Sequence, residues 1–304
     1  MGTQIDINLT AQNKDLAQIA AQTAKAEFKR IENLISSWSP TSQTTKINQN
    51  AGIQPIKVDL ELFQLIEKSK KISKLTKGTF DISFASINNI WKFDGAKIDL
   101  PSQKTIRKSV AKINYKNIIL NNKDTTVFLK KKGMKIGFGA IGKGYVGDKI
   151  QQLLQRIGIK SGLINAGGDI TVWGNELKPQ GWKIGLFDPS NEDALLGMVK
   201  LKDQAIVTSG DAYQFVLIND KRYTHIINPK TGWPSRGLKT VTVIAQKAEM
   251  ADALATAIFV LGEKKGKRLI NKLKDVEVFM VNEMGEFIMS NGFPFIPNSD
   301  IQKN

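Results

Sequence analysis

A glycine-rich segment in the middle of the chain has residue types that can bind phosphate. Gly137, Gly139, Gly142 and Gly144 surround Lys143, between a predicted strand and a predicted helix. The spacing matches the dinucleotide pattern G-x-G-x-x-G, and it departs from the phosphate loop G-x-x-x-x-G-K-[ST] only at the last residue. Glycines let backbone N–H groups and a helix N-terminus approach a phosphate, and a lysine adds positive charge. A plain packing turn would have the same sequence.

A second candidate lies near the C-terminus, on a predicted helix that contains Asp252 and Thr256 among small apolar residues. Residues four apart share one face of a helix, so this carboxylate and this hydroxyl point to the same side. Two oxygens in this arrangement can serve a magnesium ion that keeps waters and substrate phosphate as its other ligands. The alternative is that Asp252 caps the helix and that Thr256 has no special role.

The one histidine of the chain, His225, ends a predicted strand and leads into a turn over residues 228–232. An imidazole in such a loop can act as a general base, because its ordinary pKa lies near working pH. A surface histidine without a role is the alternative. Two further loops, 165–169 and 208–211, place an aspartate after small residues at the end of a short strand. Loops of this kind hold ligands in many proteins, and tight turns with an Asx hydrogen bond have the same composition.

The composition excludes several kinds of chemistry. The 304 residues include no cysteine and one histidine, which rules out a thiolate nucleophile, an iron–sulfur cluster, a disulfide framework and a metal site with two imidazoles. Any metal would be a hard cation with oxygen ligands. The chain has 44 Lys and Arg against 28 Asp and Glu, a net charge of +16, which favours anionic partners. The basic residues form short clusters that are typical of solvated helix faces.

The elements that position these segments are helices and short strands. Apolar residues at helical spacing from Leu16 predict a long helix that ends near Trp38 to Pro40, and another over 59–77, with Asp59 as N-cap and Gly78 at the C-terminal end. The polar stretch 41–50 is predicted to be a loop, and residues 79–124 give no clear pattern. Strands are predicted at 5–9, 125–129, 162–165, 170–173, 182–187, 205–208, 240–245, 276–281 and 287–290, a hairpin at 213–227, and helices at 146–157, 249–261 and 263–273.

This order of elements predicts an α+β fold, because blocks of two helices and a strand are followed by antiparallel-type strands and not by a regular βαβ series. We expect a single domain over residues 1–304, with two tightly packed lobes divided near residue 125 as the alternative. No signal peptide follows Met1, and no apolar stretch approaches the roughly 20 residues that cross a bilayer. The sequence is therefore expected to be that of a soluble protein.

Taken together, these segments resemble the FAD:protein FMN transferase family, the ApbE-like flavin transferases. The resemblance covers nearly the whole chain and consists of eight motifs in order. These are Met1-Gly2-Thr3, Ser37-Trp38-Ser39-Pro40 with Asn48 after it, Gly78-Thr79-Phe80-Asp81-Ile82-Ser83, Gly139-Ala140-Ile141-Gly142-Lys143-Gly144-Tyr145, Ala166-Gly167-Gly168-Asp169, Thr208-Ser209-Gly210-Asp211, His225-Ile226-Ile227-Asn228-Pro229-Lys230-Thr231-Gly232 and Ala251-Asp252-Ala253-Leu254-Ala255-Thr256.

The resemblance implies an ApbE-like, T-fold-related fold of mixed and antiparallel sheets packed with helices. It implies an enzyme that uses Mg²⁺ and FAD, attaches FMN through a phosphoester to a Thr or Ser hydroxyl of an acceptor protein, and releases AMP. By position, Asp252, Thr256 and the backbone carbonyl of Ala140 would bind the metal, and His225 would take the proton of the acceptor hydroxyl. The residues implied to contact the flavin nucleotide are Met1, Trp38, Thr79, Phe80, Asp81, Lys143, Asp169, Ser209, Ile227 and Thr231.

The chain departs from the family pattern in a few places. Gly137 stands where the family often has Asp, and Asn228 stands where it usually has Asp. Family members normally carry an export leader ahead of Met-Gly-Thr, and none is visible in this sequence. The expected location is the periplasm or the outer face of the inner membrane if a leader was trimmed, and the cytoplasm otherwise. Membrane association is expected only through such a leader or a lipid anchor.

Two other functions stay open from the sequence. An FAD pyrophosphatase on the same scaffold would use water in place of the acceptor hydroxyl and release FMN and AMP; the difference depends on how well water is excluded. A basic nucleic-acid-binding protein is supported only by the charge of +16. The sequence has no helix-turn-helix, RNP-type aromatic pair or basic arm, so nucleic acid is not an expected partner.

Overall fold

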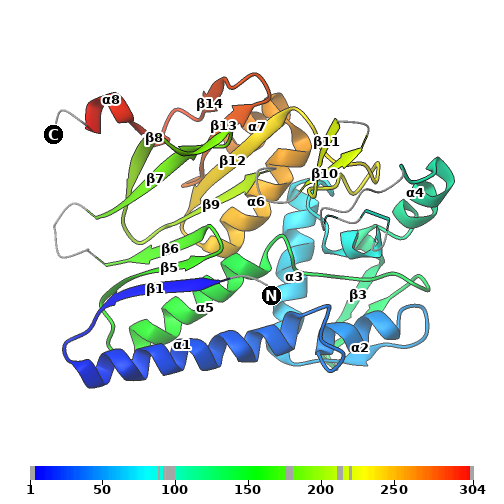
Figure 1. Cartoon of the computed structure of the whole chain (residues 1–304). Helices are drawn as coiled ribbons and strands as arrows, with labels where there is room; N and C mark the ends of the chain where they lie inside the picture. Colours follow the sequence, from blue (N-terminus) through cyan, green and yellow to red (C-terminus); the bar gives the residue numbers. More distant parts are fainter. Residues whose placement is uncertain are drawn as a thin grey trace. The chain divides into compact units, whose positions relative to one another are not determined.

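The computed structural model describes residues 4–87, 90, 91, 93, 100–174, 181–210, 215–218 and 221–301. The chain divides into two compact units, each assembled from separated segments of sequence. Unit 1 comprises Met1, Arg30–Ile141 and Tyr213–Arg236, and unit 2 comprises Gly2–Lys29, Gly142–Ala212 and Gly237–Asn304. Residue 125, near which the sequence placed a possible boundary, lies inside unit 1. Figure 1 follows the chain through these segments.

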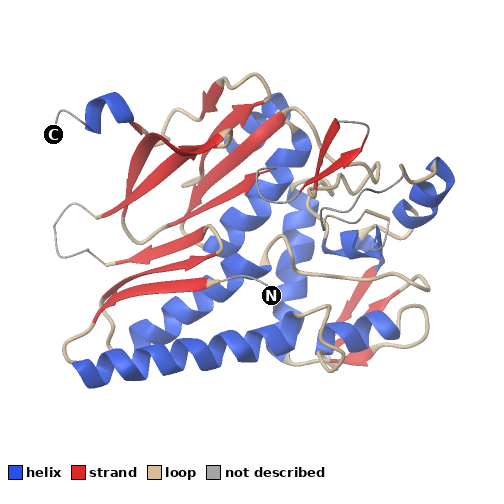
Figure 2. Cartoon of the chain, in the orientation of Figure 1, coloured by secondary structure: helices blue, strands red, loops and turns tan. Residues whose placement is uncertain are grey.

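Unit 2 is built on a seven-stranded antiparallel sheet. Its strand order is β1 (Ile5–Thr10), β5 (Ser161–Ala166), β6 (Asp169–Trp173), β9 (Ala205–Gly210), β12 (Leu238–Ala245), β13 (Glu277–Asn282) and β14 (Phe287–Met289). The sequence predicted all seven strands to within a few residues. The α+β class is confirmed, since these strands pair antiparallel beside separate helices (Figure 2).

Two helices contact this sheet, α5 (Gly142–Arg156) and α6 (Ala248–Leu261). α5 contacts β5 and β6, α6 contacts β9 and β12, and the helices contact each other (Figure 1). The residues of α6 at positions 251, 253, 255 and 257 are buried alanines, whose small side chains let neighbouring backbones come close. α7 (Glu263–Ile270) follows, and it ends three residues before the predicted end at 273.

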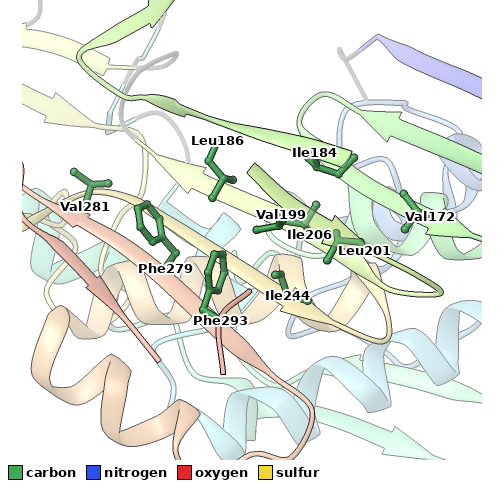
Figure 3. Packing of buried hydrophobic residues seen from close by; sticks show 10 residues of the cluster. All are labelled: Val172, Ile184, Leu186, Val199, Leu201, Ile206, Ile244, Phe279, Val281 and Phe293. Atoms are coloured by element: carbon green, nitrogen blue, oxygen red, sulfur yellow. The ribbon is translucent and has the colours of Figure 1, made fainter. Parts of the chain in front are cut away.

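A small sheet packs on the large one through an apolar cluster, and consists of β7 (Trp182–Asp188), β8 (Asn191–Leu201) and β15 (Ile296–Pro297). A short helix, α8 (Asn298–Ile301), follows β15. Figure 3 shows the members of the cluster: Val172, Ile184, Leu186, Val199, Leu201, Ile206, Ile244, Phe279, Val281 and Phe293. Because β12 is covered on both faces, the five residues 241–245 are all buried, and four of the five are apolar.

Unit 1 contains several short elements. They are α2 (Gln43–Gln49), β2 (Ile56–Lys57), α3 (Leu60–Leu75), the 3₁₀ helices η1 (Ile82–Ile87) and η2 (Tyr115–Asn117), α4 (Gln103–Val110), β3 (Ile118–Asn121), β4 (Thr126–Leu129), β10 (Phe215–Ile218) and β11 (Lys221–Thr224). β4 lies between β2 and β3, and β10 pairs with β11 in a hairpin. That hairpin packs on η1 and α4 through Ile87, Trp91, Ile106, Val216, Ile218 and Tyr223. The long helix α1 (Lys14–Ile35) begins in unit 2 and ends in unit 1, about three residues before the predicted end near Trp38.

Three predictions of secondary structure are wrong. The stretch 41–50 is not a loop throughout, because α2 forms there with Ser42 as its N-cap, whose Oγ accepts the backbone N–H of Thr45 at 3.0 Å. Asp59 occupies the N-cap position of α3, but its carboxylate accepts a hydrogen bond from the side chain of Gln43 at 2.6 Å and caps no backbone N–H. Strand β8 was missed, because its first half is polar and it contains Gly197.

None of the helices that the structure describes combines the length and the apolar character required to span a bilayer.

Candidate active site

Lys143 and Asp169 form an ion pair in unit 2. Lys143 is the second residue of α5, and its Nζ donates a hydrogen bond to Asp169 Oδ1 at 2.8 Å and to the carbonyl oxygen of Gly167 at 3.4 Å. The side chain of Asp169 is 1% exposed and that of Lys143 is 30% exposed. The lysine therefore reaches from the surface to a buried carboxylate.

A tight turn places Asp169. Ala166 at the end of β5 pairs with Asp169 at the start of β6, so Gly167 and Gly168 alone make the turn. Both have positive φ, 59° and 94°, which glycine adopts without strain and which a two-residue type I′ hairpin requires. The backbone N–H of Gly168 donates to Asn165 Oδ1 at 2.8 Å. The tight-turn interpretation of residues 165–169 is confirmed, and the effect of the turn is to fix the aspartate at the beginning of a strand.

Asp252 lies on α6 and is 3% exposed. Its Oδ2 accepts the backbone N–H of Gly144 at 3.2 Å, so the N-terminus of α5 is bonded to α6 at this point. The two backbones are in close contact here, because a Cβ on Gly144 would lie 2.2 Å from the carbonyl oxygen of Ala248. At Gly144 the packing-turn interpretation is correct: the glycine is needed so that the helices can meet.

The charges of Lys143, Asp169 and Asp252 shift one another's pKa values. Burial raises the pKa of Asp169, and burial together with the carboxylate of Asp169 raises the pKa of Asp252 well above its ordinary value. Burial alone would lower the pKa of Lys143, but the charges of Asp169 and Asp252 outweigh it and raise that pKa. One lysine thus compensates two buried carboxylates. Within the described part of the chain, Asp169 Oδ2 is buried and accepts no hydrogen bond from an N–H or hydroxyl group, and the side chains of Asp169 and Asp252 can share a hydrogen bond when one of them is protonated.

These residues fit a hard divalent cation. A buried carboxylate oxygen without a donor is costly unless a proton or a cation meets it, and Mg²⁺ prefers oxygen ligands. Thr256 lies one turn after Asp252 on α6, and its Oγ1 is 3.3 Å from the Oγ of Ser209. Among the described residues no group of three or more His, Asp or Glu is placed to hold a metal. Hydroxyl, backbone and water oxygens would therefore complete the coordination.

Sequence reasoning missed a further buried carboxylate, that of Asp148 on α5. Its Oδ1 and Oδ2 accept the backbone N–H groups of Ala248 and Glu249, each at 3.0 Å. Burial raises the pKa of Asp148 to about 6, although these two hydrogen bonds oppose the shift. No signal in the sequence pointed to it, because Asp148 lies on the side of the predicted helix opposite Val146, Ile150 and Leu154.

The catalytic candidate, His225, lies in unit 1 at the end of β11. It is exposed, and its ring meets the ring of Phe93 edge-on, with 6.4 Å between centroids. The residues that follow it are held by the Asn228 turn, in which Thr231 Oγ1 accepts the backbone N–H of Trp233 at 3.3 Å. Ile227 is half-buried and forms an isolated bridge with Pro234. Trp38, also in unit 1, exposes 84% of its surface.

The segment 79–81 is buried in unit 1. Asp81 Oδ1 accepts the backbone N–H and the hydroxyl of Ser83 at 2.8 and 2.6 Å, and Oδ2 accepts the backbone N–H of Tyr115 at 2.7 Å. Burial raises the pKa of Asp81, and these bonds oppose the shift. The Thr79 hydroxyl donates to the carbonyl of Thr76, and Phe80 is 1% exposed. These side chains are bonded or packed inside unit 1, and their contact with a flavin stays a prediction.

The predicted site residues therefore fall into two groups. The structure brings together Lys143, Asp169 and Asp252 in unit 2, and it pairs Ser209 with Thr256 on the same helix as Asp252. The others that it describes belong to unit 1: Trp38, Thr79, Phe80, Asp81, Ala140, His225, Ile227 and Thr231. Met1 lies outside the described residues.

This α+β fold, and the acidic site that two adjoining helices and a hairpin form in it, occur in a known family of proteins. Residues 1–280 match the model of the ApbE family, and the chain belongs to that family.

Individual relatives agree with this assignment. A protein named FAD:protein FMN transferase from Klebsiella pneumoniae (strain 342) is 30% identical over 293 residues, which cover 96% of this chain and 90% of that protein. The crystal structure of the ApbE protein of Thermotoga maritima is 31% identical with a TM-score of 0.88, over 95% of this chain and 94% of that one. The structure described as flavin transferase ApbE from Vibrio cholerae has a TM-score of 0.87 at 23% identity, over 97% and 96% of the two chains, and supports the fold alone.

Proposed function

We propose that this protein transfers FMN from FAD to a threonine or serine hydroxyl of an acceptor protein, with AMP as the second product and Mg²⁺ as the required metal. The chain is a transferase of the ApbE family, and its relatives are named for flavin transfer to protein. The observation that supports a metal-dependent reaction is the buried pair Asp169 and Asp252. Among the described residues, Asp169 Oδ2 accepts no hydrogen bond from an N–H or hydroxyl group.

The proposed metal ligands are Asp252 and Thr256, with the backbone carbonyl of Ala140 assigned from the family resemblance. Asp169 Oδ2 is a further oxygen donor beside Asp252. When bound, the ion would neutralise charge on the diphosphate of FAD and on the departing AMP. Lys143 supports the same negative charge as a fixed cation, since its ion pair with Asp169 holds the ammonium in place.

His225 is the proposed general base. The acceptor hydroxyl is a weak nucleophile while it keeps its proton, so an imidazole that takes this proton activates it. The hydroxyl oxygen then forms a bond to the phosphorus of the FMN half. The bond from that phosphorus to the bridging oxygen breaks, and AMP leaves with the bridging oxygen. The proton remains on His225, and no oxidant or reductant is required.

Trp38 is the proposed surface for a ring of FAD. Its exposed indole offers a flat apolar face, on which a flavin or adenine ring can stack with an edge or offset geometry. An aromatic ring that is largely exposed in the protein without ligand gains contact area when a planar ligand covers it.

The proposal is tested by incubating the protein with FAD, MgCl₂ and purified candidate acceptors, and by measuring the acceptor mass. A covalent gain of FMN with matching AMP release supports transfer. The variant His225→Ala should lose roughly 10²–10⁴ in rate and keep its affinity for FAD. AMP release that is equally fast without any acceptor would show a pyrophosphatase instead. Unchanged turnover in the variant would remove His225 from the mechanism.

A further inference from the structure

The positive charge of the chain is divided unevenly between the two units. Unit 1 contains 24 Lys and Arg against 9 Asp and Glu, whereas unit 2 contains 20 against 19. Nearly all of the net charge of +16 therefore belongs to unit 1, although unit 2 is the larger.

Six lysines of unit 1 lie on neighbouring segments, and we call them the basic surface. They are Lys77, Lys112, Lys116, Lys130, Lys131 and Lys132. They come from the end of α3, from the segment between α4 and β3, and from the turn after β4.

Contacts within unit 1 hold the turn after β4 against the segment 111–117. Lys131 Nζ donates to the carbonyl oxygen of Ala111 at 2.6 Å, and the backbone N–H of Lys130 donates to the carbonyl oxygen of Asn117 at 3.0 Å. Lys112 Nζ lies 3.1 Å from the position that a Cβ on Gly133 would occupy. The lysines of the two segments are therefore close in space and not only in sequence.

A second contact extends the basic surface toward the proposed base. The residue after Lys77 is Gly78, and a Cβ placed there would lie 3.8 Å from the ring of Tyr115 and 3.9 Å from Cε of Lys230. Tyr115 directly precedes Lys116 in η2, and Gly78 directly follows Lys77. The close approach of Gly78 to Tyr115 therefore brings the backbone segments of Lys77 and Lys116 together. Lys230 belongs to the turn that follows His225.

The charge of the basic surface is not neutralised within the described residues. Lys112 is half-buried and the other five lysines are exposed. No carboxylate in the described ranges pairs with any of the six; the pairs Arg30–Glu61 and Lys71–Glu67 lie elsewhere in unit 1. The carboxylate of Asp81, four residues after Lys77, is buried, and both of its oxygens accept hydrogen bonds from other groups. The basic surface therefore projects a positive potential into solvent.

The chemistry of this surface favours a large anionic partner. The six lysines come from several segments of unit 1, whereas a single small anion needs only one or two cations. The ammonium group of lysine is strongly hydrated and lies at the end of a flexible side chain. Lysines are therefore better suited to attracting an anionic partner over a distance than to forming a contact from which water is excluded. Complementary charge of this kind raises the rate of encounter between macromolecules.

We infer that the basic surface recruits the acceptor protein through an acidic patch on that protein. This inference rests on the proposed function, because the proposed transfer of FMN requires an acceptor protein as a second macromolecule. An acidic patch near the reactive threonine or serine would bring the hydroxyl to the unit that carries His225. Chemistry on FAD alone would not depend on this surface.

The test compares two charge-matched triple variants. In unit 1, Lys116→Gln, Lys130→Gln and Lys132→Gln remove three charges and leave the backbone contact of Lys131 intact. In unit 2, Lys264→Gln, Lys265→Gln and Lys272→Gln remove the same charge from exposed positions in and after α7. Binding is measured by fluorescence anisotropy with a labelled peptide that has a central threonine flanked by glutamates, and with the same peptide in which glutamines replace the glutamates.

We expect the wild type to prefer the glutamate peptide, with an affinity that falls as salt is added. The unit 1 variant should lose roughly tenfold in affinity, and the unit 2 variant should change by about twofold or less. Equal losses in the two variants would show a general effect of net charge and overturn the inference. The inference is also wrong if vesicles with phosphatidylserine, or single-stranded DNA, displace the peptide at lower concentration than an unlabelled glutamate peptide does.

FAD affinity, measured by flavin fluorescence in the same samples, separates this inference from the proposed function. Retained FAD binding without preference for the glutamate peptide contradicts the basic surface alone. Absence of FAD binding in the wild type contradicts the proposed function, whatever the peptides show.

Discussion

The carboxylate of Asp148 on α5 caps the N-terminus of α6 by accepting the backbone N–H of Ala248 at 3.0 Å. Its second oxygen accepts the N–H of Glu249 at the same distance. The residue in the N-cap position of α6, Lys247, makes no side-chain cap bond. A neighbouring helix thus supplies the acceptor that a helix N-terminus requires. Because α6 also carries Asp252, this cap helps to fix the position of the acidic site.

Replacing Asp148 with alanine should destabilise the protein by about 1–2 kcal/mol, since two backbone N–H groups at the buried start of α6 lose their acceptor. Denaturant unfolding measures this change. The matched control is Asp124→Ala, because Asp124 is exposed in the turn between β3 and β4 and bonds only the side chain of Asn121 among described residues. Equal stability of the two variants would contradict the capping role.

The stability of the protein should also depend on the ionisation of Asp148. Burial raises its pKa from an ordinary value of 3.8 to about 6. The folded state therefore binds this proton more tightly than the unfolded state does. The resulting stabilisation is complete below the unfolded pKa and is lost as pH rises through the folded pKa.

The variant Asp148→Asn removes this dependence. Between about pH 4 and pH 7, its free energy of unfolding should rise relative to that of the wild type by about 2 kcal/mol. Urea unfolding of both proteins at a series of pH values gives the difference. A difference that stays constant over this range would show that Asp148 titrates normally.

Gly144→Ala should destabilise the protein by about 3 kcal/mol, because the new Cβ would lie 2.2 Å from the carbonyl oxygen of Ala248 and backbone cannot move aside as a side chain can. Gly139→Ala is the control, since its Cβ would meet only the ring of Phe84, at 3.7 Å. Thermal unfolding compares the two. A stable Gly144→Ala protein would mean that α5 and α6 are farther apart than the structure places them.

Lys143→Met should lower stability by about 2 kcal/mol, a value reduced from that of fully buried pairs because the lysine is partly exposed. The variant leaves Asp169 and Asp252 without their cation, so added Mg²⁺ should raise its melting temperature more than it raises that of the wild type. Thermal scans with excess MgCl₂ and with EDTA measure this. Lys160→Met, at an exposed position, should respond to Mg²⁺ as the wild type does. If Lys143→Met gains no more than this control, the acidic pair does not bind the ion.

Trp38→Ala should leave thermal stability unchanged, because 84% of the tryptophan is exposed. If the indole stacks on a ring of FAD, the affinity for FAD should fall by up to about tenfold. Titration of flavin fluorescence gives the affinity. Ile53→Ala removes another exposed apolar side chain of unit 1 and should change neither quantity. Unchanged FAD affinity in Trp38→Ala would place the flavin elsewhere.

Much of the fold could be predicted because the strands of unit 2 are short apolar runs bounded by glycine or polar turns. The turn at Gly167 and Gly168 is an example, since two adjacent glycines permit a hairpin that few other residues allow. Helix α2 could not be predicted in this way. Its seven residues are mostly polar, and it begins after Ser42, whose hydroxyl accepts a backbone N–H of the first helical turn. A serine hydroxyl can form the same kind of bond in a turn without a helix, so the residue type does not decide between the two.

The site was predictable where its residues are near in sequence. Asp252 and Thr256 are four apart on a helix, and that spacing alone places them on one face. The pairing of Lys143 with Asp169 depends on how a helix and a hairpin meet, and no local pattern contains that information. Asp148 left no local signal either, because it lies opposite the apolar stripe of its helix and is buried only where α5 meets the start of α6.

The seven-stranded sheet draws its strands from nearly the full length of the polypeptide, and this sets the order in which the protein can assemble on the ribosome. Strand β1 is separated from its partner β5 by the longest segment of unit 1. The pair β12 and β13 follows every segment of unit 1 in the chain. During synthesis β1 therefore stays without its partner until residues 30–141 have been made, and contacts between strands so distant in sequence slow folding.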